Sequence, residues 1–165
     1  WTFRRTILRA ELGGMQEEAT KKRAFSMLEK RDYSVKELTD RLLEKGEPPE
    51  AVHALTARLV ELGVLDDARY AGLVTRHYAA KGYGARRIRD ELYRRGVPKP
   101  LWDEAIGELP EPDDTVDRLL RARLRGAQAD RDALRKASAA LQRRGFSYDE
   151  ISAAIARYAP EAAEE

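Results

Sequence analysis

The sequence predicts an all-α protein made of three tandem three-helix repeats in an elongated, curved, right-angled stack, with a short N-terminal extension. Apolar residues recur at helical intervals of three and four, and no strand-like alternation occurs between Thr20 and Pro160. Helix start and stop signals bracket the apolar stripes. Glycines 46, 96 and 145 are 50 and 49 residues apart, and each follows a Lys or Arg. This regular spacing indicates stacked units that are too small to bury their apolar faces alone.

The first repeat is expected over residues 21–63, after an extension over residues 1–20 that has no clear period. Its second helix begins at Ser34, where Ser34 and Glu37 form a capping box that satisfies orphan amides. That helix ends at Gly46, and the third begins at Pro48-Pro49, because a proline at the first helical position gives up an amide that has no helical partner. The predicted core positions are Val35, Leu38, Leu42, Val52, Leu55, Leu59 and Leu62.

The second repeat, residues 64–110, and the third, residues 111–160, follow the same order. When the three glycines are aligned, Leu42, Leu92 and Leu141 fall in one column. Prolines 110 and 112 separate the last two repeats, with Asp113 or Asp114 as the expected N-cap. The helices of the third repeat are predicted over 115–125, 130–144 and 147–158, and residues 161–165 form an acidic tail.

The composition narrows the class of protein. The 165 residues include no cysteine, so no disulfide framework, thiol nucleophile or thiolate metal site is expected. No apolar run approaches the length of a membrane span, and arginines interrupt the first ten residues. We therefore expect a cytoplasmic protein without membrane contact, and a monomer.

The charges are segregated along the chain although the formal net charge is only +2. Residues 76–99 hold eight Lys or Arg and two acids, residues 102–117 hold seven acids and no base, and residues 118–144 hold nine bases and two acids. Such blocks are typical of a surface that meets polyanions or a patterned partner.

No set of residues in the sequence predicts catalysis or a cofactor. The turn Gly82-Tyr83-Gly84 follows a helix and lacks the third glycine of a phosphate loop, so we interpret it as a helix joint. His53 and His77 have no cysteine near them, and the paired carboxylates at 66–67 and 113–114 lie where helices begin, which favours capping. We expect no enzyme, no metal and no cofactor.

Two groups of basic residues are the candidate binding residues. In the middle repeat, Ile88 and Leu92 face the core, which places Arg86, Arg87 and Arg94 outward. In the third repeat, Arg118, Arg121 and Arg125 lie at i, i+3 and i+7 on one ridge. Arginine presents a planar fork that suits phosphates and carboxylates, although a solvated face paired with nearby acids is the simpler alternative for any one of them.

The chain resembles the RecX family on three stretches. These are Ser34-Val35-Lys36-Glu37-Leu38 leading to Leu42 and Gly46, then Leu59 to Leu65 followed by Asp66-Asp67-Ala68-Arg69-Tyr70-Ala71, and then Lys81-Gly82-Tyr83-Gly84 with Ile88, Glu91-Leu92 and Gly96. The resemblance covers residues 21–158, and its specific part lies in the first two repeats.

The resemblance implies a negative regulator of the RecA recombinase that lodges in the groove of the RecA–DNA filament and lowers ATPase activity and strand exchange in DNA repair. Such an inhibitor needs no active site, and single- or double-stranded DNA is a further expected partner. The alternative is a stand-alone helical DNA-binding or transcription-regulating module, because a three-helix unit can resemble a helix-turn-helix. The residues expected to contact filament or phosphate are Lys81, Tyr83, Arg86, Arg87, Arg94, Arg118, Arg121 and Arg125.

Overall fold

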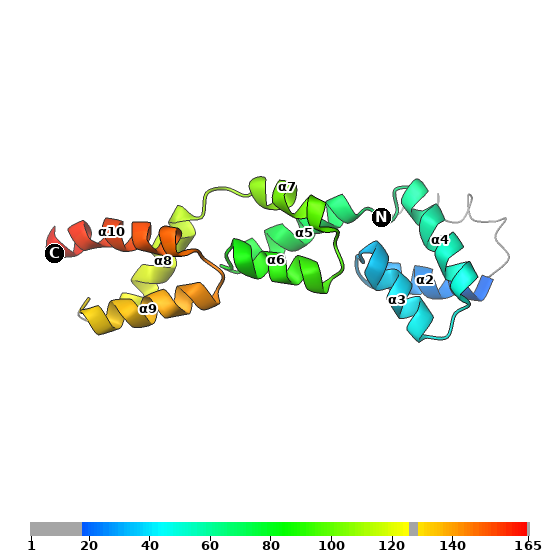
Figure 1. Ribbon diagram of the computed structural model, residues 1–165, viewed down its shortest axis with the longest axis horizontal. Coiled ribbons are helices and arrows are strands. Elements are labelled where there is room, and N and C mark those ends of the chain that lie inside the picture. The colour runs from blue at the N-terminus through cyan, green and yellow to red at the C-terminus, as the bar shows by residue number, and fades with distance from the viewer. Residues whose placement is uncertain (1–17, 126–128, 165) are drawn as a thin grey trace. The chain divides into compact units, whose positions relative to one another are not determined.

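The computed structural model describes residues 18–125 and 129–164, and every regular element in those residues is a helix (Figure 1). The all-α prediction is therefore confirmed for the described chain. Residues 1–17 of the predicted extension over residues 1–20 lie outside the described residues, and residues 18–20 begin the first described helix. The α-helices are α2 (Glu18–Lys30), α3 (Val35–Glu44), α4 (Pro49–Glu61), α5 (Asp67–Ala80), α6 (Ala85–Arg94), α7 (Trp102–Gly107), α8 (Asp113–Leu124), α9 (Arg131–Arg143) and α10 (Tyr148–Glu164). A short 3₁₀ turn, η1 (Lys99–Leu101), precedes α7.

The chain divides into two compact units. Unit 1 runs to Tyr70 and includes Arg95–Val97, and unit 2 consists of Ala71–Arg94 and the chain from Pro98 onward. Unit 1 thus holds α2, α3, α4 and the first turn of α5, whereas unit 2 holds the rest of α5 and α6 to α10.

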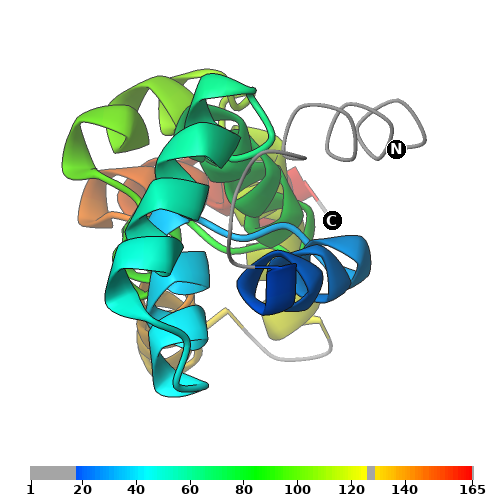
Figure 2. The same cartoon turned by 90° about the vertical axis from the view of Figure 1, so that its right-hand side faces the viewer.

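The core of unit 1 lies between α2, α3 and α4, which pack against one another in both ribbon views (Figures 1 and 2). The predicted stripes of α3 and α4 are buried there, with Leu38, Leu42, Val52 and Leu59 fully inaccessible. Val35 and Leu62 are half-buried at the edge of this cluster. The periodicity of three and four therefore identified the buried faces of both helices.

The helix ends of unit 1 follow the predicted chemistry. The Ser34 hydroxyl accepts from the Glu37 amide at 3.0 Å, and the Glu37 carboxylate accepts from the Ser34 amide at 3.1 Å. This reciprocal pair is the predicted capping box. Pro49 is the first residue of α4, and Gly46 has a φ of 82°, which a glycine adopts without steric cost.

Unit 1 also binds the turn that follows α6. The Ser34 hydroxyl donates to the carbonyl of Arg95, and the Arg95 guanidinium donates to the Tyr70 hydroxyl at 2.9 Å. That hydroxyl donates in turn to Glu37 at 2.9 Å. Asp67, at the start of α5, accepts from the Val35 amide at 2.9 Å. All of these residues belong to unit 1, so the contacts tie the first turn of α5 and the Arg95–Val97 turn to the start of α3.

The core of unit 2 has two parts. In the middle repeat, Ile88 and Leu92 of α6 are fully inaccessible. In the third repeat, α8, α9 and α10 pack around Val116, Leu120 and Leu141, with Phe146 joining from the α9–α10 turn. Leu42, Leu92 and Leu141 are 0%, 0% and 1% exposed, which confirms that the aligned column is a core position in each repeat.

Two boundaries in the third repeat differ from the prediction. The N-cap of α8 is Pro112, and Asp113 is already helical, because Pro112 adopts a helical ψ that draws the helix start forward. Helix α10 continues to Glu164, past the predicted end at residue 158, because Pro160 removes only one amide from a run of good helix formers.

Candidate polyanion-binding surface and adjoining cleft

The middle and third repeats are joined by backbone hydrogen bonds at the start of α6. The Gly84 amide donates to the Arg144 carbonyl at 2.8 Å, and the Arg86 amide donates to the Gly145 carbonyl at 3.1 Å. These amides belong to the first turn of α6, where an isolated helix has no acceptor. The turn after α9 therefore caps α6 within unit 2.

Two arginine side chains strengthen this joint. The Arg86 guanidinium donates to the Gln142 carbonyl at 3.0 Å. From the other side, the Arg144 guanidinium donates to the carbonyls of Lys81 and Gly82 at 3.2 and 3.3 Å. Cations at carbonyl-rich helix ends are stabilising, because they face the negative end of the helix dipole. Arg86 is exposed, but its guanidinium links the middle repeat to the third repeat through the Gln142 carbonyl.

Tyr83 lies at the centre of a cluster of cations and rings. The Arg144 and Arg87 guanidinium carbons lie 5.4 and 5.7 Å from the centroid of its ring, and the Tyr78 ring lies 5.7 Å away. The Lys81 ammonium lies 5.8 Å from the centroid of the Tyr78 ring. These distances are within reach of cation–π attraction, so the half-buried Tyr83 ring holds the joint together.

Arg87 and Arg94 share one carboxylate. Glu91, 7% exposed, accepts ion pairs from Arg87 at 3.4 Å and from Arg94 at 3.1 Å. Two cations around one nearly buried anion leave a net positive site on α6. Arg94 is exposed, whereas Arg87 is half-buried against Tyr83, so only Arg94 of this pair stands outward as the sequence predicted.

The acidic block at residues 102–117 partly neutralises the basic blocks. Arg89 pairs with Asp103 at 2.7 Å. Arg157 on α10 forms a bidentate pair with Asp117 on α8, with nitrogen–oxygen distances of 2.7 to 3.1 Å. This hydrogen bonding to Asp117 raises the pKa of Arg157. The Arg89–Asp103 pair thus joins the acidic block to the basic block at 76–99, whereas Arg157 lies outside both basic blocks.

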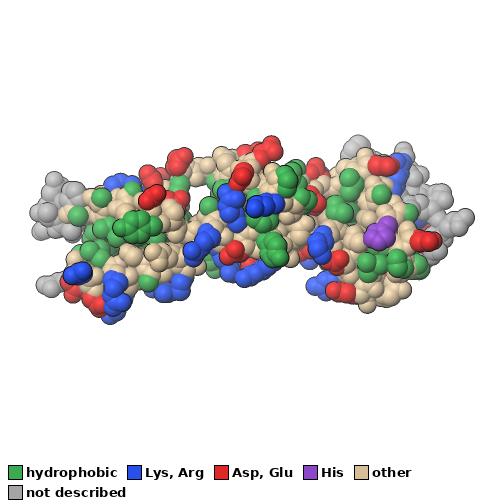
Figure 3. Space-filling model, in the orientation of Figure 1, with side chains coloured by type: hydrophobic (Ala, Val, Ile, Leu, Met, Phe, Trp, Pro, Cys, Tyr) green, Lys and Arg blue, Asp and Glu red, His purple; other side chains and the backbone are tan. Residues whose placement is uncertain are grey.

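The ridge on α8 is the larger exposed basic surface. Arg118, Arg121 and Arg125 are all exposed, and Val116, Leu120 and Leu124 are buried on the opposite face. Among the residues that the structure describes, neither Arg118 nor Arg125 forms an ion pair. We call these three arginines the α8 ridge. On the face of unit 2 seen in Figure 3, basic side chains gather over α6 and α9 and acidic ones over α7 and the linker to α8.

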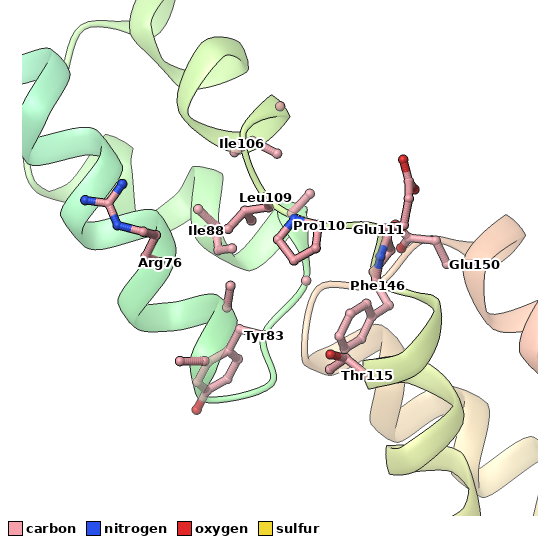
Figure 4. A pocket seen from close by; sticks show the side chains of 16 residues that line it. Arg76, Tyr83, Ile88, Ile106, Leu109, Pro110, Glu111, Thr115, Phe146 and Glu150 are labelled. Carbon is pink, nitrogen blue, oxygen red and sulfur yellow. The ribbon is translucent and has the colours of Figure 1, made fainter.

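A cleft of about 490 Å³ adjoins the joint within unit 2 (Figure 4). Its walls come from α5, from the Tyr83–Ile88 segment, from the end of α7 with the proline linker, and from Thr115, Phe146 and Glu150 on the third repeat. Sequence reasoning placed none of the lining residues except Tyr83 in a candidate site, because the cleft is formed by three stretches that are distant in the chain, 76–88, 106–115 and 146–150.

The remaining polar candidates have structural contacts. Asp66 accepts from the Arg69 amide at 3.0 Å and so caps α5.

Within the described residues, no group of three or more His, Cys, Asp or Glu side chains could hold a metal ion. In the same part of the chain, no helix has both the length and the apolarity that a membrane crossing requires.

Arg144 is the main residue that the sequence analysis missed. It bonds the middle repeat through two carbonyls and faces the Tyr83 ring. The signal was present, because Arg144 and Arg95 occupy the same position before aligned glycines, and each reaches a tyrosine: Arg144 reaches Tyr83 of the preceding repeat, and Arg95 reaches Tyr70 of its own repeat.

Comparison with known proteins agrees with the geometry of repeated three-helix units. Residues 21–59, 66–106 and 111–155 match the family models described as the first, second and third three-helix domains of RecX. The chain is 37% identical over 151 residues to the regulatory protein RecX of Halorhodospira halophila, covering 87% of this chain and 90% of that protein. It is 38% identical over 143 residues to the one from Xanthomonas axonopodis pv. citri, covering 84% and 87%.

The fold is also similar to solved structures. The crystal structure of RecX from Lactobacillus salivarius superposes with a TM-score of 0.78 at 19% identity, covering 84% of this chain and 94% of that one. A second crystal structure, of a regulatory protein RecX, gives a TM-score of 0.72 at 21% identity, covering 81% of this chain and 68% of that one. At these identities the likeness concerns the fold.

Proposed function

Because this chain belongs to the RecX family of regulatory proteins, we propose that it is a negative regulator of the RecA recombinase that binds the RecA–DNA filament and lowers its ATPase activity and strand exchange. The observation that carries the binding mode is the α8 ridge: Arg118 and Arg121 are exposed one turn apart on α8, and Arg125 is exposed at the residue that caps its C-terminal end. Exposed arginine forks suit phosphate oxygens and carboxylates, and a nucleoprotein filament presents both. The protein acts in this proposal as a monomer in the cytoplasm.

The proposal divides the candidate residues by role. Arg86, Tyr83 and Lys81 hold the joint between repeats and keep the third repeat in place. Arg94 and the α8 ridge are the residues that meet a partner, because they are exposed. Arg87 has an indirect role, because its guanidinium lies against the Tyr83 ring and pairs with Glu91.

The test is DNA-dependent ATP hydrolysis by RecA with increasing amounts of the protein. The wild type is expected to lower the rate at or below one molecule per RecA protomer. A variant with Arg118, Arg121 and Arg125 changed to alanine should lose inhibition, while a matched variant with Lys22, Lys30 and Arg41 changed to alanine, which removes the same charge from exposed positions of unit 1, should retain it. Equal inhibition by both triple variants would contradict the role of the α8 ridge.

The second candidate function is a stand-alone DNA-binding module, which the exposed α8 ridge also favours. This function predicts tight, sequence-dependent binding to naked duplex DNA that weakens steeply with salt, because phosphate contacts release counterions. Such binding without any effect on RecA ATPase activity would replace the filament proposal.

A further inference from the structure

The cleft in unit 2 has apolar walls on opposite sides. Phe146 lies across the cleft from Tyr83, and Leu109 lies next to Ile88 with Ile106 beyond it (Figure 4). Ile106, Leu109 and Tyr83 are only half-buried. A volume of about 490 Å³ exceeds the space that a single large side chain needs, and half-buried apolar walls gain from an apolar occupant.

Carboxylates outnumber cations at the rim of the cleft. Glu111 on the proline linker and Glu150 on α10 line one side, and Arg76 on α5 lines the other (Figure 4). Glu150 accepts from the Ser147 amide at 2.6 Å, whereas Glu111 and Arg76 are exposed and form no ion pair within the described residues. Glu104 and Glu108 add two more exposed carboxylates on the segment that leads into the linker.

We infer that this cleft receives a large apolar side chain from a basic segment of a protein partner, with lysine or arginine of that segment facing Glu111 and the neighbouring carboxylates. The inference rests on the proposed function, so the segment belongs to the RecA protomers of the filament. In the cleft, the apolar anchor gives affinity and the complementary rim charges give orientation. The α8 ridge is then a second contact with the same filament.

The occupant is protein and not nucleic acid because carboxylates outnumber cations at the rim, with Glu111 and Glu150 on one side against Arg76 on the other. A phosphate chain that follows a base into the cleft would lie against Glu111 and Glu150, and like charges at a contact cost free energy. Protein segments with an apolar anchor and flanking cations meet no such penalty. The positively charged ridge on α8 is the surface of unit 2 that suits phosphate.

The test measures affinity of the fluorescently labelled full chain for RecA filaments assembled on poly(dT). Ala80 is exposed at the cleft, so Ala80→Trp obstructs it without entering the core. Ala57→Trp, at an exposed position of α4, is the matched control. Glu111→Lys reverses the rim charge, and Glu50→Lys makes the same change at an exposed position of unit 1. Circular dichroism verifies that all four variants fold.

Ala80→Trp should weaken filament binding by about tenfold or more, because it excludes the anchoring side chain, while Ala57→Trp stays within about twofold of the wild type. Glu111→Lys should weaken filament binding relative to Glu50→Lys. For naked poly(dT), the two variants of each matched pair should have equal affinities, that is, Ala80→Trp the same as Ala57→Trp and Glu111→Lys the same as Glu50→Lys. Equal binding by Ala80→Trp and Ala57→Trp overturns the inference about the cleft alone. Tighter binding by Glu111→Lys than by Glu50→Lys overturns it in favour of nucleic acid, and wild-type protein that fails to bind filaments overturns the proposed function with it.

Discussion

Gly84 and Gly145 are in backbone contact where the third repeat meets the middle one. A Cβ atom on Gly84 would lie 2.5 Å from the carbonyl carbon and oxygen of Gly145, which is closer than real Cβ contacts come. The adjoining amides of Gly84 and Arg86 donate across the same contact. The lack of a side chain at both positions is therefore what permits the two repeats to join through their backbones.

Gly84→Ala should destabilise the protein by about 1–3 kcal/mol, because the added methyl group must displace a backbone rather than a flexible side chain. Gly107→Ala is the control, since its Cβ would meet nothing within 4 Å and Gly107 has an ordinary helical φ. We expect that control to change the free energy of unfolding by less than about 1 kcal/mol, in the stabilising direction. Urea unfolding followed by circular dichroism measures both, and equal values would contradict the contact.

Gly145→Ala should cost more than Gly46→Ala. Both glycines have positive φ, 96° and 82°, so both variants incur the left-handed penalty of about 1–2 kcal/mol. Only at Gly145 would the new atom also collide with the backbone of Arg87, because the space around Gly46 is open. The difference in unfolding free energy between the two variants measures the joint alone, and a difference of zero would show that the joint tolerates a side chain.

Arg86→Ala should lower the free energy of unfolding by about 0.5–1.5 kcal/mol, the usual worth of one hydrogen bond, because it removes the link to the Gln142 carbonyl. Arg118→Ala should change it by less than about 0.5 kcal/mol, because Arg118 is exposed and outside such contacts. Thermal and urea unfolding of the two single variants would separate an arginine that joins repeats from one that does not. Identical stabilities would mean that the Arg86 link contributes nothing in solution.

Leu92→Ala should destabilise the protein by about 2–5 kcal/mol, since it removes most of a core side chain and leaves a cavity. Leu92 is fully inaccessible, whereas Tyr93, the next residue, is 73% exposed. Tyr93→Ala is therefore the control on the same helix, and its effect should be within about 0.5 kcal/mol. Comparable losses from both substitutions would mean that α6 has a different register.

Asp67→Asn tests a half-buried carboxylate. Burial raises the pKa of Asp67 above its ordinary value of 3.8, against the hydrogen bond from the Val35 amide, and the nearby charges of Asp66 and Glu37 add to the rise. Because the folded state then holds its proton more tightly than the unfolded state, the contribution of Asp67 to stability falls as pH rises through the interval above 3.8. Asparagine keeps an oxygen for the Val35 amide and does not titrate.

The Asp67→Asn variant should therefore be at least as stable as the wild type at neutral pH. As the pH falls toward 3.8, the free energy of unfolding of the wild type should rise relative to that of the variant. Melting temperatures of both proteins across a pH series measure the difference. A gap that stays constant with pH would show that Asp67 has the same pKa in both states.

Most of the fold could be predicted from local signals. The capping box at Ser34, the glycine at 46 and the proline at 49 act within one or two turns of chain, so their effects are visible in sequence. The N-cap of α8 was predicted too late because Pro112 competes with Asp113 for the position, and the outcome depends on the conformation of the proline linker.

The candidate site was less predictable. Sequence reasoning correctly treated Arg118, Arg121 and Arg125 as exposed, because the opposite face of α8 is apolar. It treated Arg86 and Arg87 in the same way, although their heads bind the Gln142 carbonyl and Glu91. Periodicity shows which face of a helix points away from the core of its own repeat. It carries no information about which residues of another repeat contact that face.

The sequence by itself determined the all-α class, the threefold repeat and the core column at Leu42, Leu92 and Leu141, because propensity, capping and periodicity act between residues near in the chain. Only the tertiary structure decided which arginines join repeats, that Arg144 reaches Tyr83, and that a cleft with Glu111, Glu150 and Arg76 at its rim lies beside the joint. Those features depend on contacts between segments far apart in the chain, such as Gly84 with Arg144. Their geometry is set by how whole repeats pack, which no local pattern encodes.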